Sequence, residues 1–126
     1  MIGDVTDATT IAAIAARYID VWNTVDPQDR RSLVAEVFAE DAGYTDPLAS
    51  VRGHAALDQL IGAAQGQFVG MSFSLGSRVD AHHDQARFTW HLGPSGSTEP
   101  LVIGFDVVVL RDGRIAEVYG FIDKMP

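Results

Sequence analysis

The sequence contains no cysteine and only one lysine, Lys124. Without a thiol the chain can form no disulfide framework, no zinc–thiolate site and no cysteine nucleophile. No apolar run approaches the ~20 residues that span a bilayer, and the first ten residues lack the basic start of a secretory signal. Nine Lys and Arg against 17 Asp and Glu give a formal net charge of −8, which repels phosphate backbones and anionic lipid. We therefore expect a cytoplasmic protein that binds neither nucleic acid nor a membrane.

What is present suffices for one folded domain. The chain has 126 residues, of which 47% are hydrophobic, so it can bury roughly two-thirds of its unfolded surface. It contains no internal repeat, low-complexity tract or linker. We therefore expect residues 1–126 to form a single domain.

Three helices are predicted in the first half of the chain. Apolar residues within 11–25 recur every three or four positions, as on one face of a helix. Asp26 and Pro27 are typical of the N-cap and first position of a second helix, whose apolar positions run to Phe38. A third helix follows Gly53.

From residue 68 onward the apolar period changes to two, which is typical of half-buried strands. The strands are predicted at residues 71–75, 87–92, 101–110 and 115–122, with a loop at 93–97. Asp112-Gly113 lies at the centre of a tight hairpin turn, and residues 44–47 form a short early strand. Helices followed by antiparallel strands indicate an α+β fold with the helices on one face of a curved sheet.

Asp106 is one of two acidic residues that stand apart from the other carboxylates. It interrupts residues 101–110, in which all the remaining residues are apolar or glycine. Because both faces of this segment are apolar by strand alternation, we expect both to be covered and Asp106 to be buried. Burial disfavours the charged form of a carboxyl, and the neutral acid can donate a hydrogen bond. The alternative is an acid that faces solvent at a sheet edge or pairs with an arginine.

Asp46 and Tyr18 are the other two candidates for a functional site. Asp46 precedes Pro47, which fixes the backbone directly after the carboxylate, although Asp-Pro also initiates turns that have no further role. Tyr18 lies on the apolar face of the first predicted helix, one turn before Trp22. A core tyrosine whose hydroxyl reaches a backbone group would explain it equally well.

Taken together, these segments resemble the SnoaL-like and ketosteroid-isomerase-like proteins, over about residues 11–122. The motifs that carry the resemblance are Arg17-Tyr18, Trp22-Asn23, Phe38-Ala39-Glu40-Asp41-Ala42, Thr45-Asp46-Pro47, Gly53, Gly104-Phe105-Asp106 and Asp112-Gly113-Arg114-Ile115. The resemblance implies the nuclear transport factor two superfold, an α+β cone. In it three N-terminal helices and a curved, mixed, mainly antiparallel sheet enclose an apolar pocket. Because that fold hosts isomerases, cyclases, dehydratases, hydrolases and non-enzymes, the motifs indicate the fold more sharply than an activity.

Within this group the residues match ketosteroid isomerase best. That match implies Asp46 as the general base, Tyr18 as the catalytic tyrosine and Asp106 as the protonated acid of the oxyanion hole. The implied reaction is proton transfer next to the carbonyl of a hydrophobic ketone. Asp46 would take the proton while Tyr18 and Asp106 donate hydrogen bonds to the enolate oxygen.

The same resemblance implies further features of the site. The apolar residues expected to form the substrate-binding walls are Trp22, Phe38, Phe68, Phe88, Trp90 and Val118. No metal and no organic cofactor is expected, and the partner is a small hydrophobic ligand. A homodimer through the outer face of the sheet is also implied, in agreement with the apolar residues on both faces of 101–110.

Other activities of the same fold remain alternatives. Polyketide cyclases use a single acid for an aldol-type ring closure, a role that Asp46 or Asp106 could take alone. Dehydratases of the scytalone type rely on histidines, whereas His82-His83 is typical of a hairpin turn. Hydrolases of the limonene-epoxide type use an Asp-Arg-Asp arrangement with no clear counterpart here. In a binding module without chemistry, Tyr18 and Asp106 would only satisfy each other.

Overall fold

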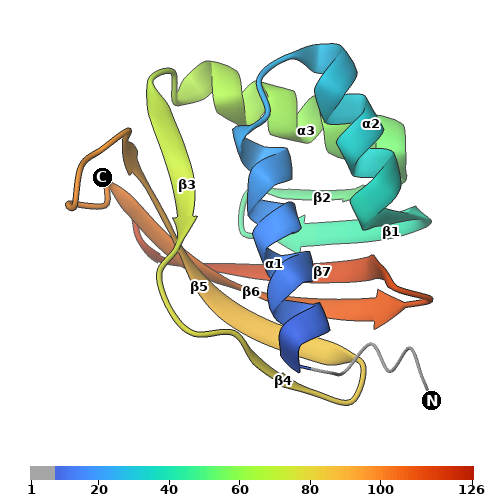
Figure 1. Cartoon of the computed structure of the whole chain (residues 1–126). Coiled ribbons are helices and arrows are strands. Elements are labelled where there is room, and N and C mark those ends of the chain that lie inside the picture. The colour runs from blue at the N-terminus through green and yellow to red at the C-terminus, as the bar shows by residue number, and fades with distance from the viewer. Residues whose placement is uncertain (1–7) are drawn as a thin grey trace.

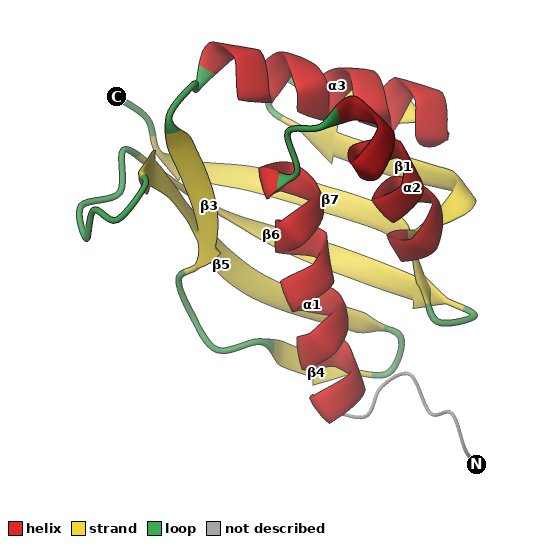
Figure 2. Ribbon diagram, turned by 45° about the horizontal axis from the view of Figure 1, so that its top comes forward, coloured by secondary structure: helices red, strands yellow, loops and turns green. Residues whose placement is uncertain are grey.

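The computed structural model describes residues 8–126 as two layers, with three helices covering one face of a curved sheet (Figures 1 and 2). The helices are α1 (Ala8–Asn23), α2 (Pro27–Val37) and α3 (His54–Gln67). The strands are β1 (Phe38–Asp46), β2 (Ala49–Arg52), β3 (Met71–Leu75), β4 (Asp80–His82), β5 (Gln85–Pro94), β6 (Val102–Arg111) and β7 (Arg114–Lys124). This confirms the predicted α+β class and the predicted order of helices and strands.

One sheet contains all seven strands. Its order is β2-β1-β7-β6-β5-β3, and β4 pairs with β5 beside this path. β1 and β7 run parallel, whereas the other pairs are antiparallel. The sheet is therefore mixed, and it does not close into a barrel because β2 and β3 end the order without pairing with each other. None of the described helices is long and apolar enough to cross a membrane.

The boundary between α2 and β1 differs from the prediction. Asp26 caps α2 as expected, because its side chain accepts a hydrogen bond from the backbone N–H of Asp29. The helix ends at Val37, and Phe38 has extended backbone angles. Phe38 pairs with Ile115 of β7, so the neighbouring strand and not the local apolar period decides its conformation.

The two shortest strands were not predicted. β2 and β4 have four and three residues, too few to show a period, and each exists because a longer strand lies beside it. β5 also runs to Pro94, into the predicted loop. The two predicted turns are confirmed. His83 has a φ of 55°, and Asp112 and Gly113 have φ values of 54° and 80° in a two-residue hairpin loop.

β6 alternates as predicted, with one correction. Asp106 and the other even-numbered residues face the helices and are buried, whereas Ile103, Phe105, Val107 and Val109 are only partly buried. The expectation that both faces are covered was therefore right for the inner face alone. Among residues 8–126 no helix covers the outer face of β6, because the helices of this part of the chain pack on the inner face (Figure 2).

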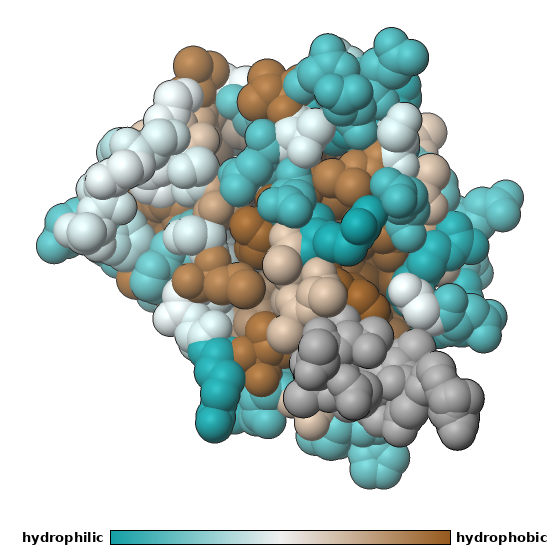
Figure 3. Space-filling view, in the orientation of Figure 1, coloured by the Kyte–Doolittle hydropathy of each residue, from teal (hydrophilic) through white to brown (hydrophobic). Residues whose placement is uncertain are grey.

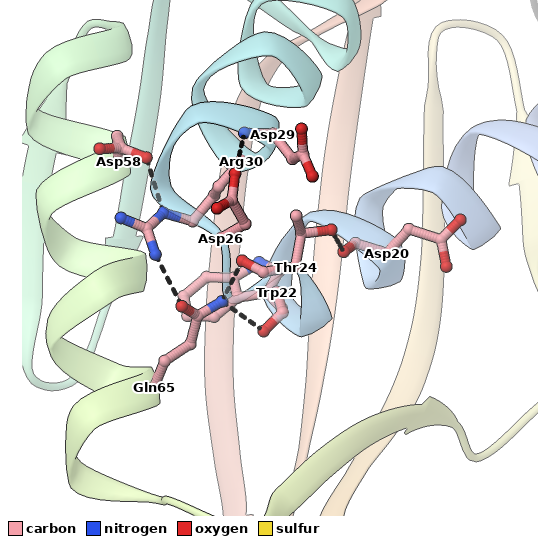
Figure 4. A network of polar contacts seen from close by, with 8 residues as sticks. All are labelled: Asp20, Trp22, Thr24, Asp26, Asp29, Arg30, Asp58 and Gln65. Carbon is pink, nitrogen blue, oxygen red and sulfur yellow. Dashed lines mark hydrogen bonds and ion pairs between the residues drawn. The ribbon is translucent and has the colours of Figure 1, made fainter.

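A polar network fixes the end of α1 against α2 and α3 (Figure 4). Gln65 of α3 donates to the carbonyl oxygens of Trp22 and Thr24, at 3.0 and 2.9 Å. Its side-chain oxygen accepts from Arg30, whose Nε lies 2.7 Å from Asp58. Arg30 is only 9% exposed, so its charge is paired inside the fold as buried charges require. The network holds the last turns of α1, and with them Tyr18 and Trp22, over the sheet.

Candidate active site

A cavity lies between the helices and the inner face of the sheet. About 930 Å³ there is free of protein atoms, part of it open to solvent. Most of its lining is apolar, from α1, α3 and strands on both sides. The polar side chains in the lining are Tyr18, Trp22, Tyr44, Asp46, Gln67, Trp90 and Asp106. Among the described residues, no lysine, arginine or histidine lines it.

Tyr18 and Asp106 form a buried pair at this cavity. The Tyr18 hydroxyl donates to Oδ2 of Asp106 at 2.7 Å, and both residues are 2% exposed. Burial raises the pKa of Asp106 to about 6, although the hydrogen bond from Tyr18 opposes the shift. Burial and the charge of Asp106 raise the pKa of Tyr18 well above its ordinary value, so the phenol stays a donor. Phe38 and Phe88 pack edge-on against the Tyr18 ring and hold it in place.

Asp46 has a different environment at the end of β1. Its Oδ1 accepts the backbone N–H groups of Leu48 and Ala49, at 2.8 and 2.9 Å. Its Oδ2 accepts the Tyr44 hydroxyl at 2.7 Å. The turn that Asp-Pro suggested is therefore present, and the same side chain also lines the cavity.

Gly120 of β7 lies between the two carboxyl groups. It is the partner of Asp106 in the β6–β7 ladder, and Asp46 follows the Thr45–Tyr119 pair in the β1–β7 ladder. A Cβ atom at Gly120 would lie 2.8 Å from Oδ1 of Asp106 and 3.2 Å from Cβ of Asp46. The three residues thus form one row across three strands, and the missing side chain lets both acids approach the same space.

The sequence also matches a known family. A family model described as a SnoaL-like domain matches residues 15–118. The chain belongs to the SnoaL-like family. This match confirms the resemblance seen in the sequence.

Solved structures agree with this assignment. A candidate isomerase of the SnoaL-like family from Agrobacterium tumefaciens str. C58 is 37% identical, with a TM-score of 0.86, and the match covers 91% of this chain and 98% of that one. A candidate ketosteroid isomerase from Kribbella flavida DSM 17836 is 21% identical (TM-score 0.71, coverage 97% and 84%). A candidate SnoaL-like polyketide cyclase from Jannaschia sp. CCS1 is 17% identical (TM-score 0.73, coverage 91% and 86%).

The last two likenesses show the fold alone, since their identities are low. No protein with curated annotation matches this sequence significantly. The activity of this SnoaL-like chain must therefore be argued from its own site.

The structure brings together the three side chains that the sequence singled out, because Tyr18, Asp46 and Asp106 all line the cavity. Of the expected walls, Trp22, Phe68 and Trp90 also line it. Phe38, Phe88 and Val118 do not. They are 0%, 2% and 0% exposed, so the structure places them in the core of this SnoaL-like domain and not in the lining of this cavity. Strand parity gave the correct face of the sheet, but it could not say how deep along that face the cavity reaches.

Two features of the site were missed in the sequence. Tyr44 is 5% exposed and contacts Asp46 directly; its position two residues before Asp46, on the same strand face, was the available signal. The indole N–H of Trp22 has no hydrogen-bond partner, alone among buried side-chain polar atoms of the described residues. No sequence pattern predicts a buried hydrogen-bond donor that has no partner.

Proposed function

We propose that this protein catalyses proton transfer next to the carbonyl group of a small, hydrophobic, uncharged ketone, as an isomerase or a cyclase. The observation that carries the proposal is the arrangement of two unlike acids in one apolar cavity. Asp106 is buried against Tyr18 with a raised pKa, whereas Asp46 accepts three hydrogen bonds. Acids in unlike environments are suited to opposite protonation states, which acid–base chemistry on one substrate requires.

The proposed step begins with the C–H bond α to the ketone. Asp46 takes the proton, and the electron pair of that bond moves into an enolate. For this step Tyr18 turns its O–H from Asp106 to the enolate oxygen. Asp106 donates to the same oxygen in its protonated form, which is favoured below its pKa of about 6. Both hydrogen bonds are strong because the two groups are buried. In an isomerase the proton returns to another carbon, and in a cyclase the enolate carbon attacks a second carbonyl group.

The charge of the cavity supports an uncharged ligand. Its lining holds two carboxyl groups and no cationic side chain among the described residues. An anionic ligand would meet these acids without a partner, and a buried charge without a partner is costly. The absence of histidine from the lining also fits proton transfer better than a histidine-dependent dehydration.

One observation favours a second candidate, a ligand-binding module without chemistry. Tyr18 and Asp106 satisfy each other at 2.7 Å, so their burial needs no catalytic explanation. This candidate predicts that ketones bind without exchange of their α protons.

Proton exchange separates the two candidates. In D2O, the wild type is expected to introduce deuterium α to the carbonyl of cyclic ketones such as 5-androstene-3,17-dione, measured by NMR. Asp46→Asn is expected to lower the rate by about 10²–10⁴-fold, since a positioned base contributes that much. The control is Asp84→Asn, an exposed acid outside the cavity. Equal rates for the wild type and Asp46→Asn would exclude Asp46 as the base.

We also propose that the protein forms a homodimer through the outer face of its sheet. The support is apolar surface there: Tyr119 and Phe121 are 45% and 52% exposed, and the ring of Phe121 stacks on that of Phe105, with centroids 5.0 Å apart. Large exposed apolar patches commonly mark interaction sites.

A further inference from the structure

Asp46 is surrounded by three hydrogen-bond donors, which leave it one free acceptor position. A carboxylate offers about four lone-pair positions on its two oxygens. The backbone N–H groups of Leu48 and Ala49 occupy both positions of Oδ1, and the Tyr44 hydroxyl occupies one on Oδ2. A proton taken from a ligand can therefore go only to the remaining position on Oδ2.

Tyr44 is the side chain that decides where this free position points. The two backbone contacts act on Oδ1 alone, and among the described residues Tyr44 supplies the one donor to Oδ2. Tyr44 reaches Asp46 because both side chains leave β1 on the same face. Its ring packs against Trp22, with ring centroids 5.6 Å apart, and is 5% exposed. The phenol is thus held by the core and not by Asp46.

The surroundings of Tyr44 keep its hydroxyl a donor. Burial and the charges of Asp106 and Asp46 raise the pKa of Tyr44 far above its ordinary value. Besides these acids, the titratable side chain that lines the cavity near it is Tyr18 of α1; α3 supplies Leu60, Ala63, Ala64 and Gln67. At neutral pH none of these neighbouring groups takes the proton of the Tyr44 hydroxyl.

We propose that Tyr44 is a positioning residue of the active site, which turns the one free acceptor position of Asp46 toward the cavity. This inference rests on the proposed proton transfer and deepens it. Without the phenol, Asp46 keeps its two contacts on Oδ1, but Oδ2 is free to accept from water. The loss falls on the step in which Asp46 takes the proton, and not on ligand binding.

Kinetics of Tyr44→Phe test the proposal with the exchange reaction described above. We expect kcat to fall about 10- to 100-fold, the scale of a misplaced reacting group, with little change in KM. In the Asp46→Asn background, Tyr44→Phe is expected to lower kcat no further. The matched control is Tyr119→Phe, which removes a hydroxyl on the outer face of the same sheet. If Tyr44→Phe lowered kcat equally in the wild-type and Asp46→Asn backgrounds, or changed only KM, the proposal would be overturned.

A second measurement needs no turnover. Urea unfolding of the wild type, Tyr44→Phe, Asp46→Asn and the double variant is expected to give non-additive losses of stability, because the two side chains share a hydrogen bond. Tyr119→Phe combined with Asp46→Asn is expected to be additive. Absent exchange by the wild type would overturn both the proposed function and the role of Tyr44 in it. Measurable exchange with additive losses would overturn the role of Tyr44 alone.

Discussion

Asp46 and Asp106 are the same residue type, lie in one row of the sheet, and have opposite surroundings. Asp106 is enclosed by the core and receives a phenol hydrogen bond, so burial is the largest influence on its pKa. Asp46 lies at the end of a strand, where three donors approach its carboxylate. The position of each acid along its strand, and not its identity, decides these surroundings.

Asp106→Asn tests the cost of this burial. Because the folded protein binds a proton at Asp106 more readily than the unfolded chain does, wild-type stability falls as pH rises from about 4 to about 6. Asparagine does not titrate, and its Oδ1 can still accept from Tyr18. The variant is therefore expected to gain up to ~3 kcal/mol on the wild type across this range, because a shift of one pKa unit corresponds to about 1.4 kcal/mol.

Urea unfolding at closely spaced pH values checks this expectation. The difference between Asp106→Asn and the wild type should grow from about pH 4 to about pH 6 and then level off. Asp84→Asn, which changes an exposed acid, should give a small difference in this range. A difference between Asp106→Asn and the wild type that does not vary with pH would show that the buried carboxyl titrates as in the unfolded chain.

At the scale of elements, β7 joins the two halves of the site. It pairs in parallel with β1, which carries Asp46, and antiparallel with β6, which carries Asp106. Gly120 is where the two ladders meet, and its backbone needs no left-handed conformation. Gly120 matters because it has no side chain: both acids lie within 3.2 Å of the position that a Cβ atom would occupy.

Gly120→Ala is therefore expected to disturb the site and the fold together. The new methyl group would meet Oδ1 of Asp106 at 2.8 Å, and overpacking of this kind costs about 1–3 kcal/mol. Gly66→Ala in α3 is the matched control, because no atom lies within 4 Å of its Cβ position. There the alanine should stabilise the helix by about 0.5–1 kcal/mol. Thermal unfolding measures both, and a neutral Gly120→Ala would contradict the crowding.

The elements that were predicted well from the sequence have a long run of regularly spaced apolar residues, and cap or turn residues mark their ends. Asp26 and Pro27 marked the start of α2, and the Asp112-Gly113 turn marked the β6–β7 hairpin. Phe38 was placed in the helix because its apolar side chain suits either conformation. Phe38 is extended because it pairs with Ile115, 77 positions later in the chain. A pattern of neighbouring residues cannot include a residue so distant.

At the scale of the whole molecule, apolar surface occurs on both faces. The helix-bearing face is mixed, with hydrophilic residues over the upper helices and apolar patches toward its centre (Figure 3). The outer face of the central strands carries the aromatic residues Phe105, Tyr119 and Phe121. We therefore expect the net charge of −8 to keep dimers apart from one another without preventing pairing through this face.

The proposed homodimer can be tested at this surface. The wild type is expected to be a dimer in analytical ultracentrifugation, and Phe121→Glu to be a monomer, because a charge placed in an apolar contact must be desolvated. Val25→Glu is the control, since Val25 is 71% exposed and lies in the connection between α1 and α2, on the helix-bearing side of the sheet. A monomeric wild type, or a Phe121→Glu variant that remains a dimer, would contradict this interface.

The sequence by itself identified the residues whose type does not fit the pattern around them. Alternation along residues 101–110 predicted that Asp106 faces inward, because a strand's two faces are set by local geometry. The motifs around Tyr18, Asp46 and Asp106 identified the family. Tertiary structure decided what these residues touch: the Tyr18–Asp106 hydrogen bond joins positions 88 apart, and Gly120 acts only through strands on either side of it. Contacts between distant segments depend on packing, which no local pattern encodes.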